Sequence, residues 1–235
     1  MSAIAKKTGD IGASFYFDPE TVARGKELGL DGFRFYFLGR GGVLGDVDSA
    51  VIRSAFGYFH PKVIGRMWDT ARTRMEPHYA AQAFIECAHL YGRRRFSGLD
   101  GLDEYVDAAS TVIGAVDGGA MALFAGVRAE PVPDDAPAAA IHQAMVLREM
   151  RGSAHLAAIT AVGLRTDVAH AIKRPDDVEL FGWGDEPPVV TDEARRLHEK
   201  AEGLTNDALV GAFATLSEAQ GEALVAGTEA MHAAL

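Results

Sequence analysis

Residues 138–162, AAAIHQAMVLREMRGSAHLAAITAV, form the longest uninterrupted helical pattern in this chain of 235 residues. Alternate steps of four and three residues give one stripe that is apolar at both ends, as expected for a helix that faces a core. The middle of the stripe carries Arg148, Gly152 and His155, and Arg151 lies beside it. Because an unpaired buried charge is strongly unfavourable, these side chains require either an acidic partner or a polar or anionic ligand.

Helix signals dominate on both sides of this stretch. Asp18-Pro19 and Asp48-Ser49 have the form of helix starts, and Pro61 begins a helix because the preceding His60 is pushed out of the α region. Further helices are expected at 77–91, 103–116 and 119–128, and near the C-terminus from residue 191.

Evidence for strands is limited to two segments. Residues 33–37, FRFYF, have a composition typical of a strand, and Val189-Val190 could form one short strand or a wing. The sequence therefore predicts an all-α fold, with an N-terminal helical bundle and a C-terminal unit in which any β-structure is minimal.

The segment AEPVPDDAP, residues 129–137, holds three prolines and three acidic residues and is typical of a surface linker. We expect it to divide the chain into an N-terminal helical domain, residues 1–130, and a C-terminal helical domain, residues 138–235.

The net charge of −10 is unevenly distributed. Residues 1–174 hold 20 acidic and 20 basic side chains, whereas residues 175–235 hold 13 acidic and 3 basic ones. Binding to a DNA duplex needs several Lys and Arg side chains against the phosphates, so this distribution argues against DNA as a partner. The lone Cys87 lies in an apolar run and is expected to be buried. The chain contains no long apolar run and no N-terminal leader pattern, which predicts a cytoplasmic protein that does not bind membranes.

Two groups of residues are candidates for a ligand pocket. Arg148, Arg151 and His155 would form one wall. The aromatic-rich segments at 33–37 and 56–60 would form the other, with polar contacts from Tyr36, Arg40 and His60. The alternative is structural: the arginines pair with acidic residues, His155 is a satisfied core histidine, and the aromatic residues are core.

Other motifs are weak. His60 could ligate haem iron, but no haem-attachment motif accompanies it, and the sequence identifies no cofactor. The glycines at 39–45 have the spacing G-x-G-x-x-x-G, which fits a tight connection between helices better than a dinucleotide site. Glu86 and His89 form a single E-x-x-H without the second copy that a di-iron bundle requires, so no metal site is predicted.

Four segments together resemble the EvbL-like actinobacterial proteins, which are described as helix-turn-helix family members. They are LDGFRFYFLGRGGVLG (30–45), AFGYFHPKV (55–63), LREMRGSAHLAA (147–158) and FGW (181–183). The resemblance implies a helical N-terminal unit followed by a winged-helix-like unit similar to MarR-type regulators. In those proteins the Gly-Trp motif precedes a long helix in the position of a recognition helix. Here only seven residues, 184–190, separate Trp183 from Thr191, so the C-terminal unit is expected to be a degenerate winged helix.

Three functions follow from these observations. The first is a small-molecule-binding helical protein with a pocket between its two units and without DNA binding. The second is a MarR-like, ligand-responsive transcriptional regulator, and the third is an enzyme that uses His155 or His60 as a general base beside an arginine. The resemblance also implies a homodimer that pairs through the terminal helices, with Leu216, Leu224 and Met231 available for an interface.

Overall fold

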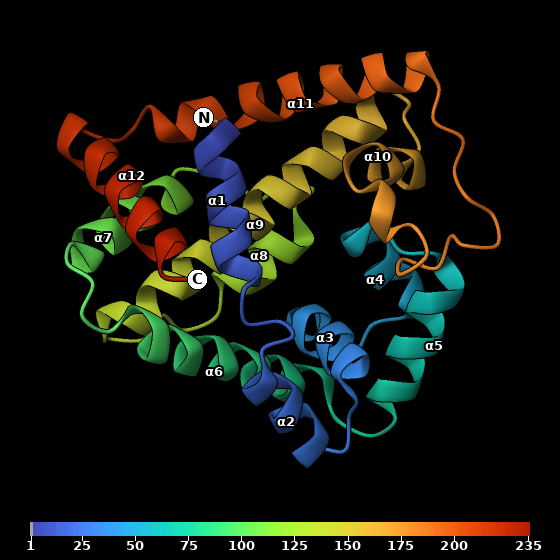
Figure 1. Ribbon diagram of the computed structural model, residues 1–235, viewed down its shortest axis with the longest axis horizontal. Helices are drawn as coiled ribbons and strands as arrows, with labels where there is room; N and C mark the ends of the chain where they lie inside the picture. The colour runs from blue at the N-terminus through green and yellow to red at the C-terminus, as the bar shows by residue number, and fades with distance from the viewer. Residues whose placement is uncertain (1) are drawn as a thin grey trace.

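The computed structural model describes residues 2–235, with side chains from Ile4 onward, and within that range it contains helices and no strand (Figure 1). The all-α prediction is therefore confirmed. No helix in this part of the chain is both long enough and apolar enough to cross a lipid bilayer. The α-helices are α1 Ser2–Ala13, α2 Pro19–Glu27, α3 Gly32–Gly41, α4 Ser49–Phe56, α5 Pro61–Arg72, α6 Pro77–Phe96, α7 Leu102–Gly114, α8 Ala122–Arg128, α9 Ala136–Ala161, α10 Thr166–Lys173, α11 Asp192–Phe213 and α12 Glu218–Ala233, with short 3-10 helices at Gly42–Leu44 and Pro175–Asp177.

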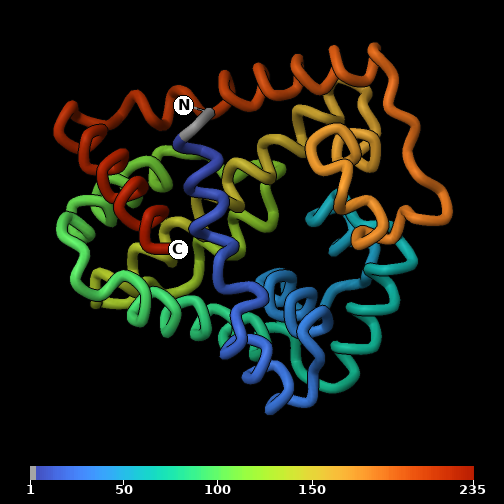
Figure 2. The backbone as a smooth tube through the Cα atoms, viewed as in Figure 1, coloured from blue at the N-terminus to red at the C-terminus, as the bar shows by residue number. Residues whose placement is uncertain are grey.

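Helix α9 is the central element. Its residues 138–147 are all buried, and a helix that is enclosed on every side must be covered by several neighbours. Helices α1, α6, α7, α8 and α11 all pack against it. The tube in Figure 2 shows α9 running through the middle of the molecule, behind α1. The sequence stretch with the strongest helical pattern is thus the one around which the other helices assemble.

The expected strand at 33–37 is wrong, because this segment is the middle of α3. Asp31 caps the helix by accepting a hydrogen bond from the backbone N–H of Arg34 at 2.9 Å. Phe35, Tyr36 and Phe37 are all buried. Aromatic residues suit a helix surrounded by core as well as they suit a strand, so composition alone misassigned the segment. Residues 189–190 also lie outside any strand, so the described chain has no wing of paired strands.

The segment at 129–137 joins helices that share one core. A single apolar cluster contains Phe15 and Phe84 from before this segment and Ile141 and Met231 from after it. A second, smaller cluster joins the end of α9 to α10 and α11 through Ile159, Leu164, Ala169, Ala194 and Ala201. The division at 129–137 stays a prediction, whereas the second cluster marks a small three-helix unit at the end of α9.

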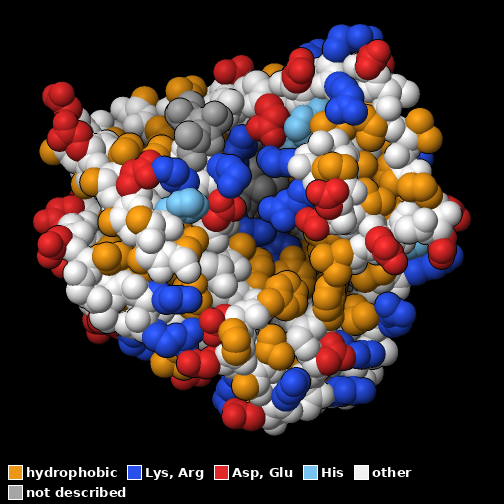
Figure 3. Space-filling view, viewed as in Figure 1, with side chains coloured by type: hydrophobic (Ala, Val, Ile, Leu, Met, Phe, Trp, Pro, Cys, Tyr) orange, Lys and Arg blue, Asp and Glu red, His pale blue; other side chains and the backbone are white. Residues whose placement is uncertain are grey.

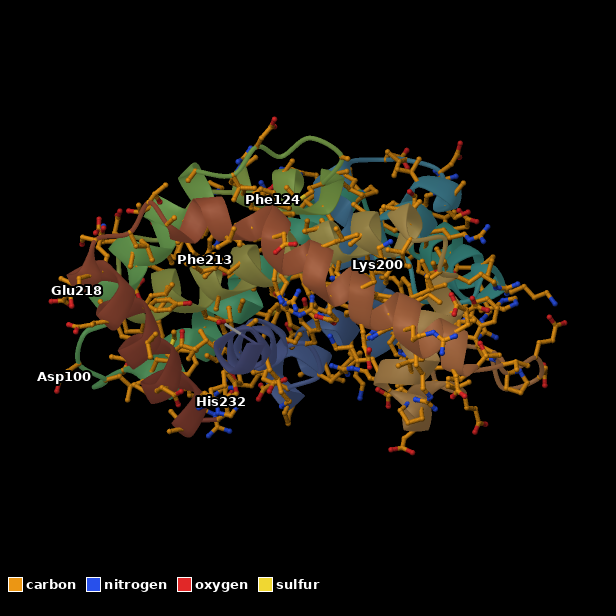
Figure 4. The ribbon with its side chains drawn as sticks, turned by 90° about the horizontal axis from the view of Figure 1, so that it is seen from above. Asp100, Phe124, Lys200, Phe213, Glu218 and His232 are labelled. Atoms are coloured by element: carbon orange, nitrogen blue, oxygen red, sulfur yellow. The ribbon has the colours of Figure 1, made fainter. Side chains whose placement is uncertain are left out.

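The terminal helices are used inside the chain. Helix α12 packs on α7 and α1, and Leu224 and Met231 are buried there. Figure 4 shows α11 crossing the molecule and α12 folding back beside it, with Glu218 and His232 near its two ends. The predicted use of Leu224 and Met231 in a dimer interface is therefore wrong, because α7 and α1 already cover this face. The homodimer itself stays a prediction.

Helix α1 approaches α9 closely at Gly12. A Cβ atom at this position would lie 2.7 Å from the carbonyl oxygen of Ala144, inside the contact limit and against a backbone that cannot swing away. A Cβ at Gly9, in the same helix, would meet nothing within 4 Å. Gly12 therefore permits the α1–α9 contact, and Gly9 does not.

We expect the substitution Gly12→Ala to lower the free energy of unfolding by about 1–3 kcal/mol, because α1 must move away from α9. Gly9→Ala is the matched control and should raise it by roughly 0.5–1 kcal/mol through helix propensity. Urea denaturation followed by circular dichroism measures both. Equal effects of the two substitutions would show that the α1–α9 approach does not limit stability.

Candidate functional site

The carboxylate of Glu149 is the centre of a buried polar cluster. Arg40 from α3 binds it with both ends of the guanidinium, Nε to Oε1 at 2.9 Å and Nη2 to Oε2 at 2.7 Å. Arg148 donates to Oε1 at 2.6 Å, and the hydroxyl of Tyr16 lies 3.3 Å from the same oxygen. Arg40 also donates to the hydroxyl of Tyr36 at 3.1 Å. We call these five residues the Glu149 cluster.

Electrostatics hold Glu149 in its charged form. Burial alone would raise its pKa, but the charges of Arg40 and Arg148, with hydrogen bonds from Arg40 and Tyr16, lower the pKa to about 2. The side chain of Glu149 is only 4% exposed, so water contributes little to its solvation. The two arginines replace that solvation, and they are also held by aromatic rings: Arg40 lies 4.3 Å from the ring centroid of Phe56 and Arg148 lies 5.1 Å from that of Tyr16.

A second cluster surrounds Glu202 of α11. Arg151 donates to Oε2 at 2.6 Å, and Lys173 of α10 lies 3.2 Å from Oε1. His155 Nε2 is 3.6 Å from the same Oε1, and its Nδ1 is 3.0 Å from the hydroxyl of Thr205. We call Glu202, Arg151, Lys173, His155 and Thr205 the Glu202 cluster. It joins α9, α10 and α11.

The two clusters act on a common region. Burial raises the pKa of Tyr58, and the charges of Glu202, Arg151, Arg148 and Arg40 also act on this hydroxyl. Figure 3 shows a hollow near the middle of one face, with Lys and Arg side chains gathered around it. Together the clusters hold Arg40, Arg148, Arg151 and Lys173 against two carboxylates, so their summed formal charge is positive.

His60 occupies a different place. It caps α5, where its Nδ1 accepts a hydrogen bond from the backbone N–H of Lys62 at 3.1 Å. Its ring stands edge-on to Trp183 at a centroid distance of 4.5 Å. A shallow pocket of about 300 Å³ beside it is lined by His60, Lys62, Val63, Arg66, Gly182, Asp185 and Glu186.

The end of α9 has the local geometry of a helix-turn-helix. Helix α9 ends at Ala161, and α10 begins four residues later at Thr166. Gly163 in the turn has φ +74°, a left-handed conformation that favours glycine. Leu164 of the same turn is buried in the second apolar cluster, which fixes α10 between α9 and α11. A short glycine-containing turn between two packed helices is the feature that defines this motif.

The comparison with protein families gives one match, to the Helix-turn-helix family, over residues 1–235. The chain belongs to the Helix-turn-helix family. No curated protein and no solved structure matches it. The resemblance found in the sequence is therefore confirmed at the level of a helix-turn-helix family, and its EvbL-like and MarR-like details stay predictions.

Membership of the Helix-turn-helix family corrects two predictions, that the protein functions without DNA binding and that DNA is not its partner. Both rested on the acidic C-terminal quarter and on the short segment after Trp183. The family match covers that segment as well, and the turn before α10 supplies a helix-turn-helix upstream of it. The acidic imbalance begins at residue 175, beyond α10, so it says little about the charge of α10 itself.

The predicted ligand-binding residues fall into three places. Tyr36, Arg40 and Arg148 meet in the Glu149 cluster, Arg151 and His155 lie in the Glu202 cluster, and His60 is at the start of α5. The alternative interpretation correctly anticipated acidic partners for the arginines. Sequence reasoning did not identify Glu149 or Glu202 as those partners, and it overlooked His198, whose buried Nε2 has no hydrogen-bond partner. Glu149 had a signal, an acid flanked by arginines on a core helix.

We expect Glu149→Gln to destabilise the fold by about 3 kcal/mol at pH 7, because the lowered pKa of the carboxyl corresponds to that much stabilisation of the folded state. A lowered pKa stabilises the fold above the unfolded-state value near 4.5, and this contribution is lost as the pH falls towards about 2. The difference between wild type and variant should therefore shrink over that interval. Denaturation at several pH values measures it, with exposed Glu104→Gln as the control. A difference that is independent of pH would contradict this account.

Proposed function

We propose that this protein is a DNA-binding transcriptional regulator that uses the helix-turn-helix formed by α9 and α10. The observation that carries the proposal is the match to the Helix-turn-helix family over the whole chain. In this motif the second helix contacts the bases in the major groove, and α10 holds that position. The MarR-like function considered from the sequence is in agreement with this assignment.

The packing of α10 supports the proposal. Ala169 and Ala171 are buried, and the second apolar cluster joins α10 to α9 and α11. DNA-reading helices need such a rigid base, because side chains that contact bases must be held in a fixed orientation. Helix α10 is therefore presented by a small three-helix core, separate from the main apolar cluster.

Charge at the two ends of α10 also supports contact with phosphates. Arg165 precedes the helix with its side chain 75% exposed, and Arg174 follows it at 61%. Each pairs with a nearby acid, Asp167 and Asp177, through an exposed arginine that water and salt screen strongly. Phosphate oxygens can therefore replace these partners at low energetic cost.

We expect the full chain to bind duplex DNA at low salt with an affinity that falls as the salt concentration rises. Replacing Arg165 and Arg174 together by Gln should weaken binding by about tenfold or more and flatten the dependence on salt by about two charges. Fluorescence anisotropy with a library of labelled duplexes, measured over a range of potassium chloride concentrations, reports both quantities.

The matched control is the double substitution Arg24→Gln and Arg95→Gln, which removes the same charge from exposed sites on α2 and α6. It should leave binding close to that of the wild type. If no duplex binds the wild type at low salt, or if both double variants lose affinity equally, the assignment of α10 is wrong.

We further propose that the two charged clusters bind an anionic effector, which would make the regulator ligand-responsive. Four cationic side chains, Arg40, Arg148, Arg151 and Lys173, face two carboxylates, so one or two negative charges on a ligand would balance them. The basic side chains around the hollow in Figure 3 are in agreement with this interpretation.

We expect small dicarboxylates or inorganic phosphate to raise the melting temperature of the wild type, because a ligand that binds only the folded state stabilises it. Arg148→Gln should reduce this shift by more than half, while Arg24→Gln should retain it. Thermal shift assays with succinate, citrate and phosphate measure the effect. No shift with any of the three anions in the wild type would contradict the effector proposal and leave the DNA-binding test unaffected.

A further inference from the structure

Three side chains with metal-binding atoms converge between α9 and α11. His155 comes from α9, and His198 and Glu202 come from α11, where a spacing of four residues puts them on one face of the helix. One ligand atom from each of the three lies within 4.8 Å of the others. Two imidazoles and one carboxylate are a common ligand set of zinc sites that keep an open position.

Hydrogen bonding fixes the tautomer of His155. The hydroxyl of Thr205 has a single proton and donates it to the carbonyl oxygen of Ala201 at 2.7 Å. The same hydroxyl oxygen must therefore accept from His155 Nδ1, 3.0 Å away, so the proton of the neutral ring is on Nδ1. The lone pair of Nε2 is then directed towards the Glu202 side of the ring. This is the arrangement found when one ring nitrogen is held by a neighbour and the other binds a metal.

Acceptor atoms consequently face one another at this point. His155 Nε2 lies 3.6 Å from Glu202 Oε1, and the buried Nε2 of His198 has no hydrogen-bond partner. Burial, as the largest cause, lowers the pKa of His155 to about 4 and also lowers the pKa of His198, so both rings are neutral at pH 7. Lone pairs that converge in this way are stabilised by a cation between them.

The neighbouring cations leave room for a metal ion. Arg151 binds Oε2 of Glu202, the oxygen that faces away from the imidazole contact, and so orients the carboxylate. Lys173 lies 3.2 Å from Oε1, but its side chain is 56% exposed and can turn into water. A divalent ion would take the place of the ammonium group at Oε1 and would gain two nitrogen ligands that Lys173 does not use.

We propose that His155, His198 and Glu202 form a binding site for a divalent transition-metal ion that prefers imidazole and carboxylate ligands, with Zn²⁺ as the leading candidate. Three protein ligands leave a fourth tetrahedral position for water. The bound ion would connect α9 to α11 beside α10 and would displace Lys173 of α10. The site stands on its own geometry and does not depend on DNA binding.

The test uses the full-length chain, freed of metal by a chelator, and titrates it with Co²⁺ and Zn²⁺. We expect one equivalent of Co²⁺ to give the intense visible absorption of a tetrahedral site, and Zn²⁺ to abolish it. His198→Ala and Glu202→Gln should each weaken Zn²⁺ binding by about a hundredfold in competition with a chromophoric chelator. His78→Ala removes a half-exposed histidine on α6 and is the matched control, which should bind as the wild type does.

Two results would overturn the proposal. One is the absence of a one-to-one complex in the wild type, and the other is unchanged Zn²⁺ affinity in either folded variant, His198→Ala or Glu202→Gln. Circular dichroism identifies variants that fail to fold, and His198→Gln, which keeps most of the side-chain volume, replaces His198→Ala in that case. Because the measurement involves no DNA, a chain that binds Zn²⁺ but no duplex would retain this site and contradict only the regulator assignment.

Discussion

The carboxylate of Glu149 sits in the one helix that the rest of the fold surrounds, and it can be there only because Arg40 comes from α3 to meet it. A charge on a central helix would otherwise prevent the neighbouring helices from closing around it. The bidentate contact at 2.9 and 2.7 Å joins two segments that are 109 residues apart in the sequence. It also positions Arg148 and Tyr16, so one ion pair sets the relative placement of α1, α3 and α9. We regard this pair as a determinant of specific assembly as well as a candidate binding element.

Much of the helical framework could be predicted because its boundaries are encoded locally. The Asp-Pro pair at residues 18–19 and Pro61 after His60 mark helix starts through backbone restrictions that act within two or three residues. Segment 33–37 was misassigned because the decisive factor is distant: its aromatic residues pack on α6 and on neighbouring aromatic rings. A helix buried on several sides loses the periodicity on which a sequence-based prediction depends.

The candidate site was predictable in part for the same reason. The stripe on α9 correctly drew attention to Arg148, Arg151 and His155, because charged side chains on a buried helix require partners. Their partners could not be chosen from the sequence, since Glu202 is 51 residues beyond Arg151 and several other acidic residues surround it. The unfavourable net charge of the C-terminal quarter was misleading for a related reason: a sum over residues 175–235 says nothing about where α10 is placed.

The position of α1 has a consequence for how the chain is made. Helix α1 packs in a groove formed by α9 and α12, and the residues that complete this groove are the last to leave the ribosome. The apolar face of α1, with Ile11 and Phe15 at its end, therefore has no native surface to cover it for nearly the whole of translation. Contacts between the two ends of a chain close slowly, since the intervening segments must be organised first. Synthesis in cells would accordingly favour a holding chaperone that covers the N-terminal segment until the final helix has emerged.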